Sequence, residues 1–169
     1  MAQRISLRDY QRELAERLRA ADAGRTSSKL AVQAGDAGWL VDLMEAGEVI
    51  PVPPITPVAQ TRPWFKGVAN VRGNLYSVVD FPAFLGGKGV SLGENSRLLL
   101  IGPRYRVGAA LLVDSSLGLR NPESWQPRET SQAPAAWQRA EYEDEAGKVW
   151  KELDVAELVR DQNFLTVGT

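Results

Sequence analysis

The chain has 169 residues, of which 44% are hydrophobic, and this is enough to bury the core of one domain. Its lysines and arginines (20 together) nearly balance its aspartates and glutamates (21 together), so it lacks the basic character that would draw it to nucleic acid. Cysteine and histidine are both absent, which excludes disulfides, thiolate metal sites and histidine-based catalysis and leaves only carboxylate, lysine or Mg²⁺ chemistry for an enzyme.

The first predicted element is an amphipathic helix over residues 7–23. Ser6 and Asp9 approximate a capping box, and Glu13 and Arg17 are spaced for a favourable pair on the charged face. The apolar stripe repeats at intervals of three and four and consists of Leu7, Tyr10, Leu14, Leu18 and Ala21. The simpler interpretation is that this stripe docks on the chain's own domain, and the alternative is a helix that binds a partner.

The opening residues lead into charged sequence rather than the apolar core of a secretory signal. No apolar run approaches the roughly 20 residues of a membrane-spanning helix. We therefore expect a cytoplasmic protein without direct membrane insertion.

Beyond the helix, the hydrophobic period changes from helical to alternating. Residues 30–32 and 39–44 flank a glycine turn at 35–38 and predict a hairpin, and 48–50 continues extended. Four prolines crowd 51–57, so this stretch is expected at a sheet edge or in a connecting loop.

The most informative segment is a second hairpin, in which residues 68–72 and 75–79 flank a tight turn at 73–74. This turn places Arg72 opposite Leu75, and the Arg72 guanidinium is expected to be free. The core side of the hairpin consists of Ala69, Val71, Tyr76 and Val78. The opposite side is a polar patch with an aliphatic rim, made of Asn70, Arg72, Leu75 and Ser77. Its simpler interpretation is an ordinary solvated sheet face.

The rest of the sequence predicts two more strand pairs and a closing helix. The first pair is 97–101 with 107–113, and the second is 137–143 with 148–153. Asp154 caps a short C-terminal helix. The fold class is therefore mainly β.

Three sets of residues suggest chemistry but are better explained structurally. The Gly-Gly-Lys-Gly run at 86–89 lacks the spacing and the Ser or Thr of a phosphate loop. The carboxylates at 141–145 lie at a hairpin tip, where charge is solvated. Asp42, Glu45 and Glu48 are three residues apart, which puts neighbouring members on opposite faces of a strand. We therefore expect no catalytic residue, no metal site and no cofactor.

Residues 67–73, together with Val-Val-Asp-Phe at 78–81, resemble the central signature of CheW-like domains. Further matches occur in the family's order at 41–49, 63–66 and 106–114. The resemblance extends over roughly residues 28–165, which makes chance similarity a poor explanation.

This resemblance implies a CheW-like fold of two small five-stranded β-barrels with a shared core. A CheW-like domain at 28–169 would follow an N-terminal helical extension at 1–27. The resemblance also implies a non-enzymatic adaptor, recruited to receptor arrays, that couples the cytoplasmic tip of a methyl-accepting chemoreceptor to the regulatory domain of a CheA-like histidine kinase.

The resemblance also assigns roles to individual residues. Two glycines, Gly67 and Gly108, are expected to serve backbone geometry. For partner contacts, the resemblance points to Asn70, Arg72 and Gly73 of the hairpin and to Glu48 and Val49 upstream, and the polar patch of the hairpin adds Leu75 and Ser77.

The long lead helix and the tryptophan-rich barrel resemble adaptors of the PilI type, which serve type IV pilus and twitching-motility systems. Ser77 stands where the family usually has proline, so the receptor that is recognised stays open. The alternatives are a coupling protein of flagellar chemotaxis and a β-barrel scaffold without a receptor. A carboxylate or Mg²⁺-dependent enzyme is the rival from another class.

Overall fold

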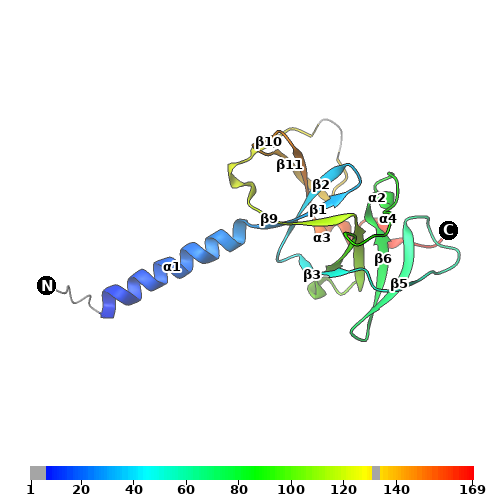
Figure 1. Ribbon diagram of the computed structural model, residues 1–169, viewed down its shortest axis with the longest axis horizontal. Helices are drawn as coiled ribbons and strands as arrows, with labels where there is room; N and C mark the ends of the chain where they lie inside the picture. Colours follow the sequence, from blue (N-terminus) through cyan, green and yellow to red (C-terminus); the bar gives the residue numbers. More distant parts are fainter. Residues whose placement is uncertain (1–6, 131–133) are drawn as a thin grey trace.

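The computed structural model describes residues 7–130 and 134–169 (Figure 1). Within these ranges the strands form two six-stranded sheets, and the long helix α1 (Leu7–Ser27) extends away from both of them. None of the helices in these ranges is long and apolar enough to cross a membrane.

The first sheet combines strands from two separate parts of the chain, in the order β10-β11-β12-β2-β1-β9. Its strands are β1 (Lys29–Ala34), β2 (Ala37–Asp42), β9 (Ser115–Arg120), β10 (Gln126–Arg128), β11 (Gln138–Glu143) and β12 (Val149–Leu153). The parallel pairing of β12 with β2 joins the two parts.

The second sheet comes from the continuous segment between them, in the order β3-β7-β8-β6-β5-β4. Its strands are β3 (Ala46–Pro51), β4 (Ile55–Thr56), β5 (Phe65–Val71), β6 (Asn74–Asp80), β7 (Arg97–Ile101) and β8 (Ala109–Val113). The short helices that complete the chain are α2 (Phe81–Phe84), α3 (Val155–Leu158) and α4 (Gln162–Leu165), with the 3-10 turns η1 (Pro103–Tyr105) and η2 (Pro122–Ser124).

The prediction of a mainly β fold in two units is confirmed, but each sheet has six strands rather than five. The additional strands are short edge pieces, since β4 has two residues and β10 has three. Both lie at or beside prolines, which cannot donate to a ladder and which therefore keep these pieces short and at an edge.

The described part of the chain contains three apolar cores, and one of them holds the two sheets together. A shared core lies between the sheets, and each sheet also encloses a smaller core of its own. Strand β8 shows how this works, because Leu111 faces the shared core whereas Ala110 and Leu112 face the interior of the second sheet. Such a strand is apolar on both faces and reads as a continuous hydrophobic run.

The expectation that the apolar stripe of α1 docks on the chain's own domain is wrong for residues 11–21. Every side chain from residue 11 to 21 is exposed, and Leu14 and Leu18 are 45% and 58% accessible. The helix also continues to Ser27, beyond the predicted end at residue 23. Ser6, the expected capping residue, lies outside the described residues.

Candidate partner-binding site

The hairpin of β5 and β6 turns one residue earlier than its sequence predicts. Val71 pairs with Asn74 and Asn70 with Leu75, so the two turn residues are Arg72 and Gly73. Both have positive φ, +52° for Arg72 and +85° for Gly73, which is the geometry of a tight hairpin turn of the I′ type. The predicted register, with Arg72 opposite Leu75, is therefore wrong.

A side chain explains why the turn closes at this point. The Asn70 Oδ1 accepts a hydrogen bond from the Gly73 backbone N–H at 2.9 Å. This bond satisfies an N–H within the turn and favours Arg72-Gly73 over Gly73-Asn74. Because the turn moves by one residue, each pairing shifts by two positions, and the predicted faces are kept: Ala69, Val71 and Val78 are buried, and Leu75 is 66% exposed.

The Arg72 guanidinium is not free, as expected from the sequence, but is held by Glu48 of β3. Its Nη1 and Nη2 donate to the two carboxylate oxygens of Glu48 at 2.8 and 2.6 Å. Such a forked pair fixes both side chains in one plane. The two residues are 24 positions apart in the chain, and their contact brings β3 beside the tip of the hairpin.

Both charges of this pair are stabilised while staying open to solvent. The hydrogen bond from Arg72 lowers the pKa of Glu48, and the bond to Glu48 raises the pKa of Arg72. The side chains are 69% and 45% exposed for Arg72 and Glu48, respectively. A partner can therefore approach a preformed, oriented pair of charges.

The structure brings together five of the seven residues predicted to contact partners, and we name this group the hairpin-tip site: Glu48, Asn70, Arg72, Gly73 and Leu75. All five are exposed. Val49 and Ser77 differ from these five residues because both are partly buried. Val49 packs against the shared core, and Ser77 is partly buried, with its backbone N–H donating to Gly108 O at 2.8 Å.

The two glycines assigned to backbone geometry both have positive φ. Gly67 has φ +131°, and a Cβ at this position would lie 2.0 Å from the carbonyl oxygen of Thr56. Gly108 has φ +52° and accepts the Ser77 N–H. Gly67 thus lets β4 lie close beside β5 at a position where a side chain would meet the β4 backbone.

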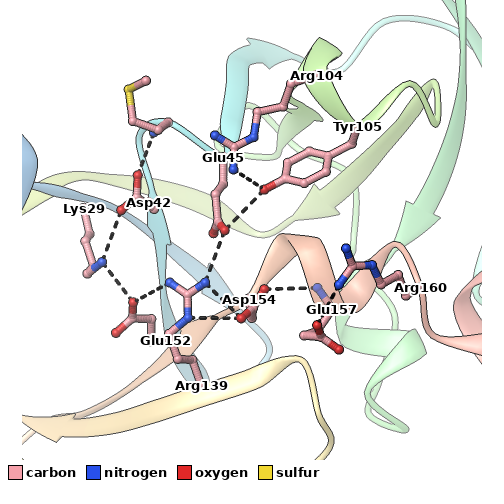
Figure 2. A network of polar contacts seen from close by, with 11 residues as sticks. Lys29, Asp42, Glu45, Arg104, Tyr105, Arg139, Glu152, Asp154, Glu157 and Arg160 are labelled. Atoms are coloured by element: carbon pink, nitrogen blue, oxygen red, sulfur yellow. Dashed lines mark hydrogen bonds and ion pairs between the residues drawn. The ribbon is translucent and has the colours of Figure 1, made fainter.

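A second polar site, centred on Arg139 of β11, was not foreseen from the sequence (Figure 2). Its guanidinium contacts Asp154 at 2.9 Å, Glu45 at 3.2 Å and Glu152 at 3.3 Å. Around it lies a network that we call the Arg139 network, comprising Lys29, Asp42, Glu45, Tyr105, Arg139, Glu152 and Asp154.

The Arg139 network joins the two sheets. Glu45 connects β2 of the first sheet to β3 of the second, and the Tyr105 hydroxyl of η1 donates to Glu45 at 3.3 Å. Glu45 and Glu152 are only 6% and 4% exposed, so their charges need partners. Glu45 lies three residues before Glu48, and this short segment therefore links the buried network to the hairpin-tip site.

The network also shifts the pKa values of Arg139 and Asp154. Burial opposes the charge of Arg139, but the hydrogen bond with Asp154 and the charges of Glu45 and Glu152 outweigh it and raise its pKa. Burial likewise opposes the charge of Asp154, yet the Glu157 N–H and Arg139 together lower its pKa. Arg139 and Asp154 therefore stay ionised at neutral pH.

No spacing in the sequence links these residues. Glu45 and Arg139 are 94 positions apart. The sequence pattern suggested only a metal site for Asp42 and Glu45, and their spacing argued against it. The one usable signal was the capping role of Asp154, which the structure bears out, since its Oδ1 accepts from the Glu157 N–H at 3.0 Å.

Comparison with known proteins identifies similar chains. A family model described as the CheW-like domain matches residues 29–163. The chain is 32% identical over 117 residues to Protein PilI of Pseudomonas aeruginosa, covering 64% of this chain and 65% of PilI. It is 28% identical over 80 residues to Chemotaxis protein CheW of Klebsiella aerogenes, covering 47% and 48% of the two chains. The match thus spans less than two thirds of either relative's length.

A solved structure shows the same fold. The crystal structure of scaffolding protein TtCheW from Thermoanaerobacter tengcongensis superposes with a TM-score of 0.63, covering 76% of this chain and 88% of that chain at 18% identity.

Proposed function

The chain belongs to the CheW-like domain family, and from this membership we propose that it is an adaptor that acts by binding alone. It couples the cytoplasmic tip of a methyl-accepting chemoreceptor to the regulatory domain of a CheA-like histidine kinase. The protein works in the cytoplasm, reaches membrane receptor arrays through its partners and carries out no chemical step.

The pathway that we propose is control of type IV pili. The similarity to Protein PilI covers more of this chain, at higher identity, than the similarity to the Klebsiella CheW. A flagellar chemotaxis system is the alternative. Either pathway needs the same two kinds of partner, so the binding site is tested in the same way.

The observation that carries this proposal is the forked Arg72–Glu48 pair at an exposed hairpin tip. A rigid arginine that still has exposed donors can recognise a carboxylate or backbone carbonyls on a partner helix. Leu75, 66% exposed on the adjoining strand, supplies apolar area beside these charges.

Recovery of partners separates the adaptor from its rivals. Pull-down from the source cells is expected to return a transmembrane chemoreceptor and a histidine kinase. A metabolic complex would favour an enzyme, and recovery of neither partner would favour a scaffold without a receptor.

Charge reversal tests the site itself. Arg72→Glu is expected to weaken binding to the receptor or the kinase about tenfold or more, because it places two carboxylates together and removes the donors offered to the partner. Glu48→Arg is the matched reversal of the other member. Titration calorimetry measures affinity, and thermal unfolding of each variant shows that the fold is kept.

The doubly reversed variant, Arg72→Glu with Glu48→Arg, distinguishes two roles of the pair. If Arg72 contacts the partner directly, the restored internal pair leaves binding weak. If the pair only holds β3 against the hairpin, binding recovers. Unchanged affinity of the folded Arg72→Glu chain for both partners contradicts the assignment of this site.

A further inference from the structure

We propose that the seam between the two sheets holds a binding site for a carboxylate carried on an apolar body. A cavity of about 420 Å³ lies there, between the β1–β2 turn, helix α2 and strands β11 and β12. Its volume falls in the range of pockets for small molecules, and its apolar lining includes Trp39, Pro82, Leu85 and Trp137. This inference goes beyond the proposed adaptor function and does not rest on it.

One wall of the cavity carries a buried N–H donor that has no acceptor among the described residues. This donor is the indole Nε1 of Trp39, a residue that is 1% exposed. A buried indole N–H usually finds a partner, because leaving it unbonded costs free energy. Phe81 and Trp137 hold the indole in place, with ring centroids 5.2 and 5.9 Å from that of Trp39. Trp39 is therefore a fixed donor that a ligand oxygen can satisfy.

A lysine lies on the same wall. Lys151 pairs directly with Trp39 where β12 runs beside β2, so both side chains lie on the side of the first sheet that faces the shared core. Its Nζ lies 5.7 Å from the centre of the Trp39 ring, but it forms no ion pair with any residue that the structure describes. Glu141, its neighbour on β11, is held instead by the Gln138 amide at 2.7 Å. A partly buried ammonium of this kind favours an anionic ligand.

The lysine and the indole together favour a carboxylate over other anions. One ammonium balances one negative charge, and one indole N–H supplies direction. A phosphate carries more charge and usually takes arginine forks or several backbone N–H groups, which neither of these residues supplies.

A carboxylate of this cavity's own lining fixes the orientation of the ligand. Asp36 lies three positions before Trp39 in the chain, roughly 10 Å away at 3.3 Å per residue, so the two ends of the cavity differ in charge. The ligand's carboxylate therefore lies at the Lys151 end, and its apolar body lies against Leu85 and Trp137. A free organic acid presents this chemistry, and so does an acidic side chain beside an aromatic one in a protein segment.

NMR of the indole N–H groups in the full-length chain tests the proposal. The chain has five tryptophans, and Trp39→Phe, which keeps a ring in the core, assigns the Trp39 signal. Phenylacetate is expected to bind with a Kd of about 1 mM or tighter and to shift the signals of Trp39 and Trp137. Trp125 and Trp150 stack on each other at the smaller core of the first sheet, so their signals should not move. Phenylacetamide, which has the same shape without the charge, is expected to bind about tenfold more weakly or worse.

A lysine substitution tests the counter-ion. Lys151→Gln is expected to weaken phenylacetate binding about tenfold or more, because it removes the ammonium and keeps most of the side chain. Arg106→Gln removes the same charge from an exposed residue at the end of η1 and is expected to leave the affinity unchanged. Thermal unfolding of both variants shows that the fold is kept.

Three results would overturn the proposal: equal binding of phenylacetate and phenylacetamide, unchanged affinity of the folded Lys151→Gln chain, or no shift of the Trp39 signal up to about 10 mM phenylacetate. A Phe-Glu dipeptide blocked at both ends distinguishes the two sources of the carboxylate. If it binds more tightly than phenylacetate, the natural ligand is a protein segment, and if it binds more weakly, the ligand is a free organic acid.

Discussion

Gly67 occupies a place in β5 where a side chain has no room. The chain bulges between Phe65 and Gly67, and the carbonyl oxygen of Thr56 in β4 lies against the Gly67 Cα. The glycine at the start of the family signature therefore has a local cause, namely the close approach of a short edge strand. Gly73, at the hairpin tip, also has positive φ but has open space around it.

These two glycines give a matched pair of substitutions. Gly67→Ala is expected to destabilise the fold by about 3 kcal/mol or more, because the added methyl group meets backbone that cannot rotate away. Gly73→Ala is expected to cost about 1 kcal/mol, the conformational penalty alone. Urea unfolding of both variants measures the difference, and equal costs would contradict the steric explanation.

Asp80, a second residue of the family signature, also has a local structural role. Its side chain is fully buried, caps α2 by accepting from the Ala83 N–H at 3.1 Å, and accepts from the Val90 N–H at 3.0 Å. Lys66 lies 3.4 Å away and balances its charge. One carboxylate thus anchors a helix and the loop that follows it.

The residues of the site could be predicted from the sequence only in part. Asn70, Arg72 and Leu75 were identified because hairpin signals are local and the family signature is specific. The contact of Arg72 with Glu48 could not be foreseen, because it depends on how β3 curves toward the hairpin. The Arg139 network was missed for the same reason, since its members converge only after the two sheets pack.

At the scale of elements, the β5–β6 hairpin was predicted with the correct strands and faces but the wrong turn. The dipeptide Gly73-Asn74 carries turn residues, yet the bond from the Gly73 N–H to Asn70 favours a turn one position earlier. The resulting turn places an arginine in the left-handed region, where glycine or asparagine is commoner. The faces were still correct because the pairing differs from the predicted one by two positions, which leaves each side chain on the same side of the sheet.

Helix α1 is the element that contributes least to its own domain. Deletion of residues 1–24 is expected to leave one cooperative thermal transition, with a free energy of unfolding within about 1 kcal/mol of the full chain, because no apolar burial is lost from residues 11–21. Circular dichroism melts at low protein concentration measure this. A broad transition or none would show that α1 belongs to the core.

At the scale of the whole molecule, the two sheets are joined by the shared apolar core and by the Arg139 network. The apolar part was foreseeable, since continuous hydrophobic strands predict burial on both faces. The polar part is the less tolerant of change, because Glu45 and Glu152 are buried carboxylates whose charges depend on one arginine and on Lys29.

Arg139→Gln is expected to destabilise the fold by about 2 kcal/mol at neutral pH, less than a fully buried pair would lose, because Arg139 is 41% exposed and Lys29 still contacts Glu152. Arg160→Gln, which removes an exposed pair with Glu157, is the control and is expected to change stability by about 0.5 kcal/mol or less.

The same substitution has a predicted pH dependence. The pKa of Asp154 is lowered from 3.8 in the folded chain, so its contribution is complete above that pH and is lost as the pH falls below it. The deficit of Arg139→Gln should therefore shrink on acidification to about pH 3. Urea unfolding at both pH values checks this, and a deficit that grows with acid would contradict it.

The order of strands along the chain also affects how the protein folds as it is synthesised. All strands of the second sheet, β3 to β8, emerge from the ribosome consecutively, so this sheet can form while synthesis continues. The β1–β2 hairpin emerges earlier but must wait for β12, its parallel neighbour near the C-terminus, before the first sheet is complete. Its apolar residues stay uncovered on the nascent chain for longest, and β1–β2 is therefore the segment most exposed to aggregation or to capture by a chaperone.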